Sequence, residues 1–180
     1  TKIIFLYLPI INNIEPINNI VMKTNSLGLP IKESEELVNE LNGLLSNYQI
    51  YYQNLRGLHW NIRGKRFFDL HIKFEELYND SQIKIDLIAE RVLTLGGVPL
   101  HTFSDYIANS KLKVGKNISK DVDAIQLILE SLSTLLQAER VILNKSGAIN
   151  DEGTNSMMSD FIAEQEKTNW MLKAWMEEEI

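Results

Sequence analysis

Apolar residues spaced alternately three and four positions apart constrain this chain more than any other feature of its sequence. The first series runs from Leu37 to Ile62, and further series follow in residues 66–95, 119–147 and 152–178. This spacing places the apolar side chains on one face of an α-helix, and no alternating pattern typical of β-strands competes with it. The sequence therefore predicts four long amphipathic helices.

The breaks between these helices are marked by capping residues, glycine and proline. Ser34 and Ser119 are predicted to cap the first and third helices, because a side-chain oxygen satisfies free backbone amides there. Glycines and a proline in residues 96–99 end the second helix. Residues 100–118 form a longer connection with a short helix at 104–109. Two short links and one long link predict an all-α four-helix bundle with one lengthwise crossover.

The third series predicts a buried stripe of five residues: Val122, Ile125, Leu129, Leu132 and Leu136.

The first 31 residues differ in composition from the rest of the chain. Residues 1–21 are rich in Asn and Ile, and ordinary mixed sequence begins at Met22. We expect residues 1–31 to form a flexible segment before a folded domain at 32–180, with Met22 as the functional start and residues 1–21 absent from the mature protein. The apolar run at 3–11 is shorter than the roughly 20 residues of a membrane-spanning helix, and no small-residue cleavage site follows it. We therefore expect a cytoplasmic protein without a membrane partner.

Composition limits the chemistry that is open to this chain. Its 180 residues include no cysteine, and the formal net charge is -6. Thiolate metal sites, cysteine nucleophiles and disulfides are therefore excluded. The acidic balance argues against a surface generally coated by nucleic acid and favours cations as partners.

A second stripe on the predicted second helix consists of residue types that bind metals. His71, Glu75, Asp86 and Glu90 follow one another at steps of four and eleven residues, which are close to whole turns. The four side chains thus share a helix face that points away from the subunit's own core. Glu75 and Asp86 lie about 16 Å apart along the axis, too far to bind one metal. One chain cannot complete a site from this stripe.

Pairing this helix with an antiparallel copy of itself brings the two halves of the stripe together. In an isologous interface, two residues face each other when their numbers add to a constant. The sum is 161 both for His71 with Glu90 and for Glu75 with Asp86. The same relation pairs apolar neighbours: Phe68 with Leu93 and Ile72 with Ala89. This pattern predicts two identical sites per dimer, each shared between the chains.

His59 precedes His71 by twelve residues across a short turn and adds a second imidazole to the predicted site. Mixed imidazole and carboxylate ligands suit Fe(II), Zn(II) and related ions, and the carboxylates favour iron chemistry by stabilising the oxidised ion. The alternative interpretation is that these residues are ordinary solvated charges on a helix face.

Three segments carry a more specific pattern: residues 58–64 (LHWNIRG), 86–91 (DLIAER) and 95–99 (LGGVP). Between the first two lie further residues of the same pattern: Phe67, His71, Phe74, Glu75 and Tyr78. With them, residues 32–178 resemble the Dps proteins, or mini-ferritins. The resemblance implies a ferritin-like bundle that assembles into a hollow dodecamer. It also implies binding of Fe(II) at twofold-shared sites, oxidation preferentially by hydrogen peroxide, and storage of the ferric mineral inside.

The resemblance also assigns individual residues. The family's ferroxidase positions correspond to His59, His71, Glu75, Asp86 and Glu90. Glu75 stands where many members have Asp, which keeps the ligand type and changes its reach. Trp60 matches a tryptophan that the family is thought to use in quenching reactive oxidants, although packing at a helix end explains it equally well.

Acidic residues at the start of the fourth helix match an iron-entry pore of the family, with a solvated helix start as the alternative. These residues are Asp151, Glu152, Asp160 and Glu164.

Of three other functions, the sequence excludes one and leaves two open. A true ferritin builds its site from Glu-x-x-His motifs, and no Glu in this chain is followed by His three residues later. A DNA-binding, nucleoid-protecting protein with little ferroxidase activity is the main alternative. However, residues 1–31 and 151–180 carry only two lysines each, so we expect no DNA compaction at physiological salt. The third is a structural bundle without metal.

Overall fold

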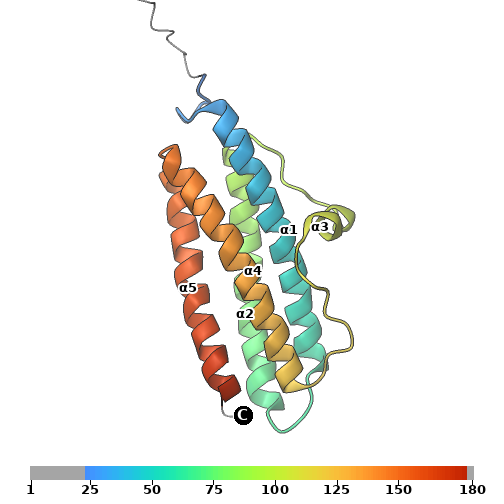
Figure 1. The fold of residues 1–180 in the computed structure, drawn as a ribbon. Coiled ribbons are helices and arrows are strands. Elements are labelled where there is room, and N and C mark those ends of the chain that lie inside the picture. Colours follow the sequence, from blue (N-terminus) through green and yellow to red (C-terminus); the bar gives the residue numbers. More distant parts are fainter. Residues whose placement is uncertain (1–22, 178–180) are drawn as a thin grey trace, which may run out of the picture.

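The computed structural model describes residues 23–177, in which four long helices pack side by side and a fifth, short helix lies beside them (Figure 1). In chain order the elements are α1 (Ile31–Asn61), α2 (Phe67–Thr94), α3 (Phe103–Asn109), α4 (Asp121–Ala148) and α5 (Glu152–Glu177). The short α3 lies in the long α2–α4 connection and packs on α1. The all-α bundle with its single crossover is confirmed. Among these described helices, none combines the length and apolar character needed to cross a membrane.

The apolar series of α1 forms the centre of the core. All its members are at most 4% exposed: Leu37, Leu41, Leu44, Tyr48, Tyr51, Leu55, Leu58 and Ile62. α1 contacts α2, α3 and α4, and α5 packs against α4. The expectation for Val122 was wrong, because this residue lies in the first turn of α4 and is 36% exposed. Ala124 and Ile125 face the bundle instead.

The start of α1 differs from the predicted serine cap. The helix begins directly after Pro30, whose backbone conformation lies outside the helical region. Ser34 lies one turn inside, where its hydroxyl donates to the Pro30 carbonyl at 2.7 Å. The preceding segment turns around Asn25, whose side-chain oxygen accepts from the amides of Leu27 and Leu29. The Ser34 cap was therefore wrong, because proline and this turn set the helix start.

The start of α4 also differs. The helix begins at Asp121, and Lys120 before it makes no side-chain capping bond. Ser119 lies outside the helix, and its carbonyl accepts from the Arg63 amide at 3.0 Å. The predicted Ser119 cap was wrong, because the backbone of this residue joins the α1–α2 turn to the start of α4.

Three asparagines of α1 hold the crossover against the bundle. Asn42 bonds the backbone of Val98 and Leu100, and Asn54 bonds that of Lys113 and Gly115. Asn47 accepts from the Lys111 amide at 2.7 Å. An amide side chain can donate and accept at once, so it replaces the partners that these loop groups lose on burial.

The middle of the bundle contains buried polar groups between α2, α4 and α5. The Lys84 ammonium donates to Asp80 and Glu164, although its side chain is only 4% exposed. Glu139 is fully buried and accepts from the Tyr48 hydroxyl at 2.8 Å and from the Gln165 amide. Burial raises the pKa of Glu139 to about 7, although these hydrogen bonds favour the charged form.

Glu139 makes the free energy of unfolding depend on pH. Its pKa is about 7 in the folded chain against an ordinary value of 4.5, so folding favours the protonated form. The contribution of Glu139 to the free energy of unfolding is present in full at low pH. It falls by about 3 kcal/mol per subunit as the pH rises from 4.5 through 7. Glu139→Gln removes this titration, and the difference in unfolding free energy between pH 4.5 and 7.5 should shrink accordingly in urea titrations.

The matched control for this experiment is Glu166→Gln, which alters an exposed acid paired with Arg140. It should leave the pH profile of stability nearly unchanged. Parallel profiles for the parent and Glu139→Gln would contradict the assignment.

Candidate metal centre

Two histidines meet where the α1–α2 turn brings the end of α1 beside the first turns of α2. The Nδ1–H of His59 donates to the His71 carbonyl at 2.8 Å, and the Nδ1–H of His71 donates to the His59 carbonyl at 2.9 Å. A carbonyl can only accept, so each Nδ1 carries the proton. With Nδ1 used in this way, Nε2 is the ring atom left to bind a metal.

Aromatic packing fixes the orientation of both imidazoles. The rings of His59 and His71 stack with centroids 3.7 Å apart at 19°. The ring of Phe67 stacks on that of His71 with centroids 5.0 Å apart, and Tyr78 meets His59 edge-on at 5.4 Å. His59 is only 9% exposed. Little reorganisation is needed before such preoriented rings bind a metal.

Glu75 completes a group of three metal-binding side chains. One candidate ligand atom from each of His59, His71 and Glu75 lies within 4.8 Å of the others. Glu75 is exposed and follows His71 by one helical turn. Two imidazoles and one carboxylate are ligands for Fe(II), Zn(II) and similar ions.

Tyr78 contacts the carboxylate side of this group. Its pKa is raised by burial first, and then by the charge of Glu75 and a hydrogen bond to it. The phenol thus stays neutral and can donate to the carboxylate. Roles for Tyr78 and Phe67 at the site were not predicted from the sequence. Their aromatic character within one helical turn of Glu75 and His71 is the signal that could have indicated them.

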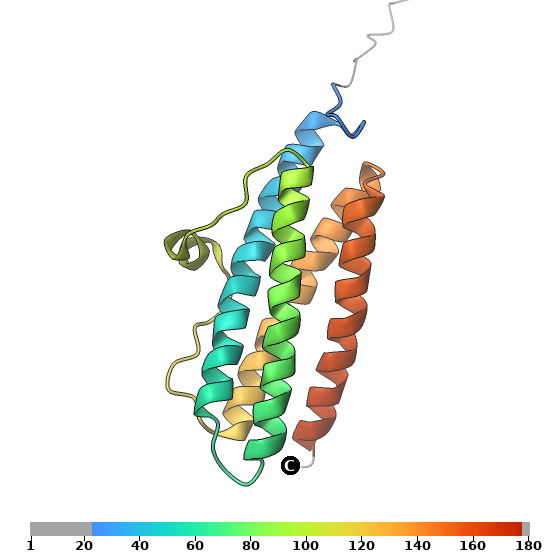
Figure 2. The same cartoon turned by 180° about the vertical axis from the view of Figure 1, so that it is seen from behind.

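Asp86 and Glu90 lie outside this group. Both are exposed on α2, and Asp86 is eleven residues beyond Glu75, about 16 Å along the axis. The solvent side of α2, which faces the viewer in Figure 2, also exposes large apolar residues. These are Phe68, Ile72, Ile83, Leu87 and Leu93, between 42% and 76% exposed. Apolar side chains gathered around exposed acids are typical of a protein interface.

Trp60 projects from the last turn of α1 and is 57% exposed. The Arg56 guanidinium lies 4.7 Å from its ring centroid and 5.4 Å from that of Tyr52. Trp60 thus follows His59 directly in the chain, but its ring lies outside the core. Core packing therefore does not account for a tryptophan at this position.

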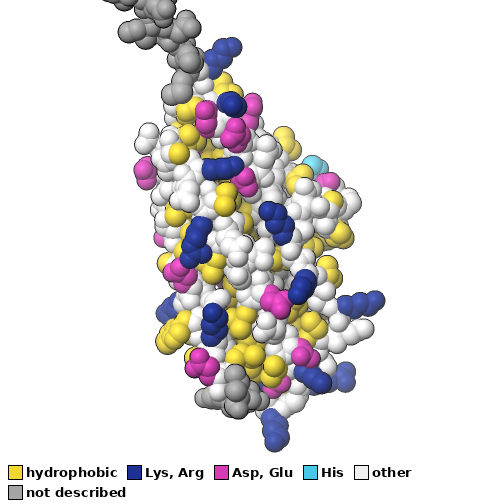
Figure 3. All heavy atoms as spheres, in the orientation of Figure 1, with side chains coloured by type: hydrophobic (Ala, Val, Ile, Leu, Met, Phe, Trp, Pro, Cys, Tyr) yellow, Lys and Arg dark blue, Asp and Glu magenta, His cyan; other side chains and the backbone are white. Residues whose placement is uncertain are grey.

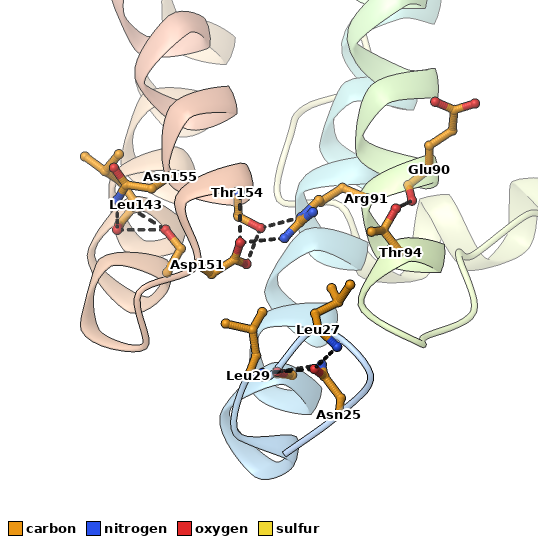
Figure 4. Close-up of polar contacts among 12 residues, drawn as sticks. Asn25, Leu27, Leu29, Glu90, Arg91, Thr94, Leu143, Asp151, Thr154 and Asn155 are labelled. Carbon is orange, nitrogen blue, oxygen red and sulfur yellow. Dashed lines mark hydrogen bonds and ion pairs between the residues drawn. The ribbon is translucent and has the colours of Figure 1, made fainter.

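Asp151 has a structural role that sequence reasoning missed. It is 2% exposed, bonds the Arg91 guanidinium at 2.5 Å, and accepts from the amide and hydroxyl of Thr154 (Figure 4). Arg91 also donates to the Thr154 hydroxyl. Asp151 therefore caps α5 and joins it to α2, which does not fit a pore lining. Asp160 and Glu152 are exposed, whereas Glu164 pairs with Lys84.

Comparison with known proteins gives a consistent result. The model of the ferritin-like domain matches residues 38–179. The crystal structure of a Dps protein from Vibrio cholerae O1, described as a member of the ferritin-like diiron-carboxylate proteins, aligns with a TM-score of 0.84 and 49% identity. The alignment covers 86% of this chain and 98% of that one. The DNA protection during starvation protein of Porphyromonas gingivalis is 40% identical over 148 residues, which are 82% of this chain and 93% of the relative.

The chain belongs to the Dps family. A second Dps structure, from Bacillus brevis, aligns at 30% identity with a TM-score of 0.78, covering 81% of this chain and 97% of the other. Membership places this Dps chain among ferritin-like proteins associated with iron storage and DNA protection. The predicted family is confirmed.

Replacing Asp151 tests its structural role. Asp151→Asn keeps the shape of the side chain but leaves the half-buried Arg91 without its counter-charge, which should lower the unfolding free energy by about 3 kcal/mol. Urea unfolding followed by circular dichroism measures this. Asp160→Asn, an exposed change on the same helix, should have little effect. Unchanged stability together with slower iron uptake in Asp151→Asn would instead support the pore role.

Proposed function

We propose that this protein is a ferroxidase and iron store whose sites are shared between two subunits. The observation that carries the proposal is the paired histidine arrangement: two imidazoles, each held by the other's carbonyl, with Glu75 beside them. Two imidazoles and a carboxylate leave positions on an iron ion for further ligands. Asp86 and Glu90 supply acids of the right type on the same helix but at a distance that requires a second chain.

A twofold pairing of α2 with its copy supports this shared site. When residue numbers add to 161, Glu75 faces Asp86 and His71 faces Glu90 of the other chain. The pairing also covers exposed apolar residues, setting Phe68 against Leu93. Each dimer then holds two sites with His59, His71 and Glu75 from one subunit and Asp86 and Glu90 from the other.

The residues have distinct tasks in iron oxidation. The Nε2 atoms of His59 and His71 bind Fe(II), and the carboxylates balance the charge that rises on oxidation to Fe(III). Two Fe(II) ions give one electron each to one hydrogen peroxide, whose O–O bond breaks while water supplies the remaining oxygen and four protons are released with the ferric oxyhydroxide. Trp60, which follows His59 in the chain and is exposed, takes up stray oxidising equivalents. Storage of the product in the hollow of a cytoplasmic dodecamer completes the proposal.

Mixing two inactive variants tests the shared site. His71→Ala and Asp86→Ala damage opposite halves of the site, so each alone should lose most rapid peroxide-dependent Fe(II) oxidation, measured by ferric absorbance. In a mixed dimer, one of the two sites receives both intact halves. Activity should therefore recover when the two variants are unfolded together and reassembled.

His101→Ala is the matched control, since His101 is exposed in the α2–α3 connection. It should oxidise iron like the parent. Activity no higher than the mean of the two variants, in assemblies shown by mass to contain both chains, would contradict the shared site. Full activity of each variant alone would contradict the ferroxidase assignment.

DNA association is a second candidate, favoured by one surface. The α1–α2 turn and the segment leading into α4 contain seven cations and no acid in residues 63–66 and 110–120. The Arg63–Ser119 hydrogen bond joins the two segments, and Figure 3 shows Lys and Arg side chains projecting at this end of the bundle. We refer to these two segments as the basic end. Relatives named for DNA protection are consistent with it.

Salt dependence separates weak DNA association from DNA compaction. Because the basic end offers only a small number of cations per subunit, we expect the protein to retard DNA in gels at about 20 mM salt. The complex should dissociate by about 150 mM salt. The double change Lys116→Gln and Lys120→Gln should weaken the low-salt complex, whereas Lys167→Gln with Lys173→Gln, on α5, should not. A complex that persists at about 150 mM would overturn the expectation that this protein does not compact DNA.

A further inference from the structure

A small cavity lies at mid-length of the bundle, between α1, α2, α4 and α5. Its volume is about 20 Å³, and it is lined by Tyr48, Tyr51, Leu77, Asp80, Leu132, Glu164, Gln165 and Thr168. A single water molecule needs about 10–15 Å³ of such space and two to four polar partners. The cavity is thus large enough for one water and too small for an organic ligand.

Three buried oxygen atoms in this part of the bundle have no hydrogen-bond partner, and two of them belong to residues that line the cavity. They are the Tyr51 hydroxyl, Oε1 of Gln165 and Oε2 of Glu139. Tyr51 and Gln165 are 4% and 5% exposed and line the cavity, and Glu139 is bonded to Gln165 behind it. Buried polar atoms without partners are costly and rare in native proteins. The two oxygen atoms on lining residues, those of Tyr51 and Gln165, point to a ligand in the cavity that bonds both.

The hydrogen-bonding capacity of these atoms identifies the chemistry of that ligand. Both N–H groups of the Gln165 amide are used, one toward Tyr48 and one toward Glu139, and Oε1 is an acceptor that still lacks a donor. The Tyr51 hydroxyl still has a proton to donate. A suitable ligand must therefore donate and accept at once, as water does.

The charges nearby exclude the other small ligands. Asp80 and Glu164, which line the cavity, disfavour an anion. A metal cation would compete with the Lys84 ammonium, which already occupies the position between Asp80 and Glu164. A neutral ligand remains.

We propose that this cavity binds one ordered water molecule, which accepts from the Tyr51 hydroxyl and donates to Oε1 of Gln165. The water then joins polar side chains of α1, α4 and α5 into one layer, next to the Lys84 ion pairs of α2. This layer sets the relative position of the four helices at mid-length, independently of the metal centre.

The sign of one stability change tests the proposal. In a dry cavity, Tyr51→Phe removes a buried hydroxyl without a partner and should raise the urea midpoint of unfolding. In a hydrated cavity it removes a hydrogen bond to the water, and we expect the midpoint to fall. Tyr52→Phe is the control, because the neighbouring Tyr52 does not line the cavity, and its effect should be smaller.

Crystallography of the parent protein gives a second, independent measurement. We expect one density peak within hydrogen-bond distance of both Tyr51 and Gln165, weakened in Tyr51→Phe. An empty cavity, or a higher midpoint for Tyr51→Phe, would overturn the proposal. So would an anomalous signal at the peak after soaking in rubidium salt, since it would identify a cation site. If Tyr51→Phe fails to fold, the density of the parent protein decides alone.

Discussion

The buried face of α1 is the constraint on which the rest of the structure depends. Its apolar series lies in the core along the whole helix, and α1 packs against α2, α3 and α4. A second, polar edge of the same helix carries the asparagines that hold the crossover. Because α1 is fixed on both sides, its end is placed accurately against the start of α2. The histidine pair lies at that junction.

The junction between α1 and α2 brings together the side chains of the candidate metal centre. The spacing of the acids along α2 limits how many of them one subunit can contribute to it. Reciprocal bonds to backbone carbonyls occupy Nδ1 of His59 and His71, and a candidate ligand atom of each ring lies within 4.8 Å of one from Glu75. The remaining acids lie farther along α2 than one ion can span. An incomplete site on an exposed, partly apolar helix face is consistent with completion by a second subunit, as in the proposed function.

Much of this arrangement could be predicted from the sequence, because apolar residues repeat with the period of the helix where one helix face is buried. The four long helices, the short one and the crossover all follow from spacing and breaks. Helix caps were predicted less well: Ser34 and Ser119 have the right chemistry, but Pro30 and a backbone contact to Arg63 determine the starts. Such contacts join residues that are distant in the chain, so local sequence does not reveal them.

The polar interior shows the same limit. Glu139 and Lys84 occupy positions on the buried faces of α4 and α2, and nothing in their local sequence indicates partners on other helices. The sequence likewise did not indicate that Asp151 is buried, because its partner Arg91 lies on another helix. The sequence by itself determined which faces are buried and which residue types share the outer face of α2, because helical geometry converts spacing into direction. Only the tertiary structure decided which charges are paired and buried, because pairing depends on distances between helices that spacing along one helix does not encode.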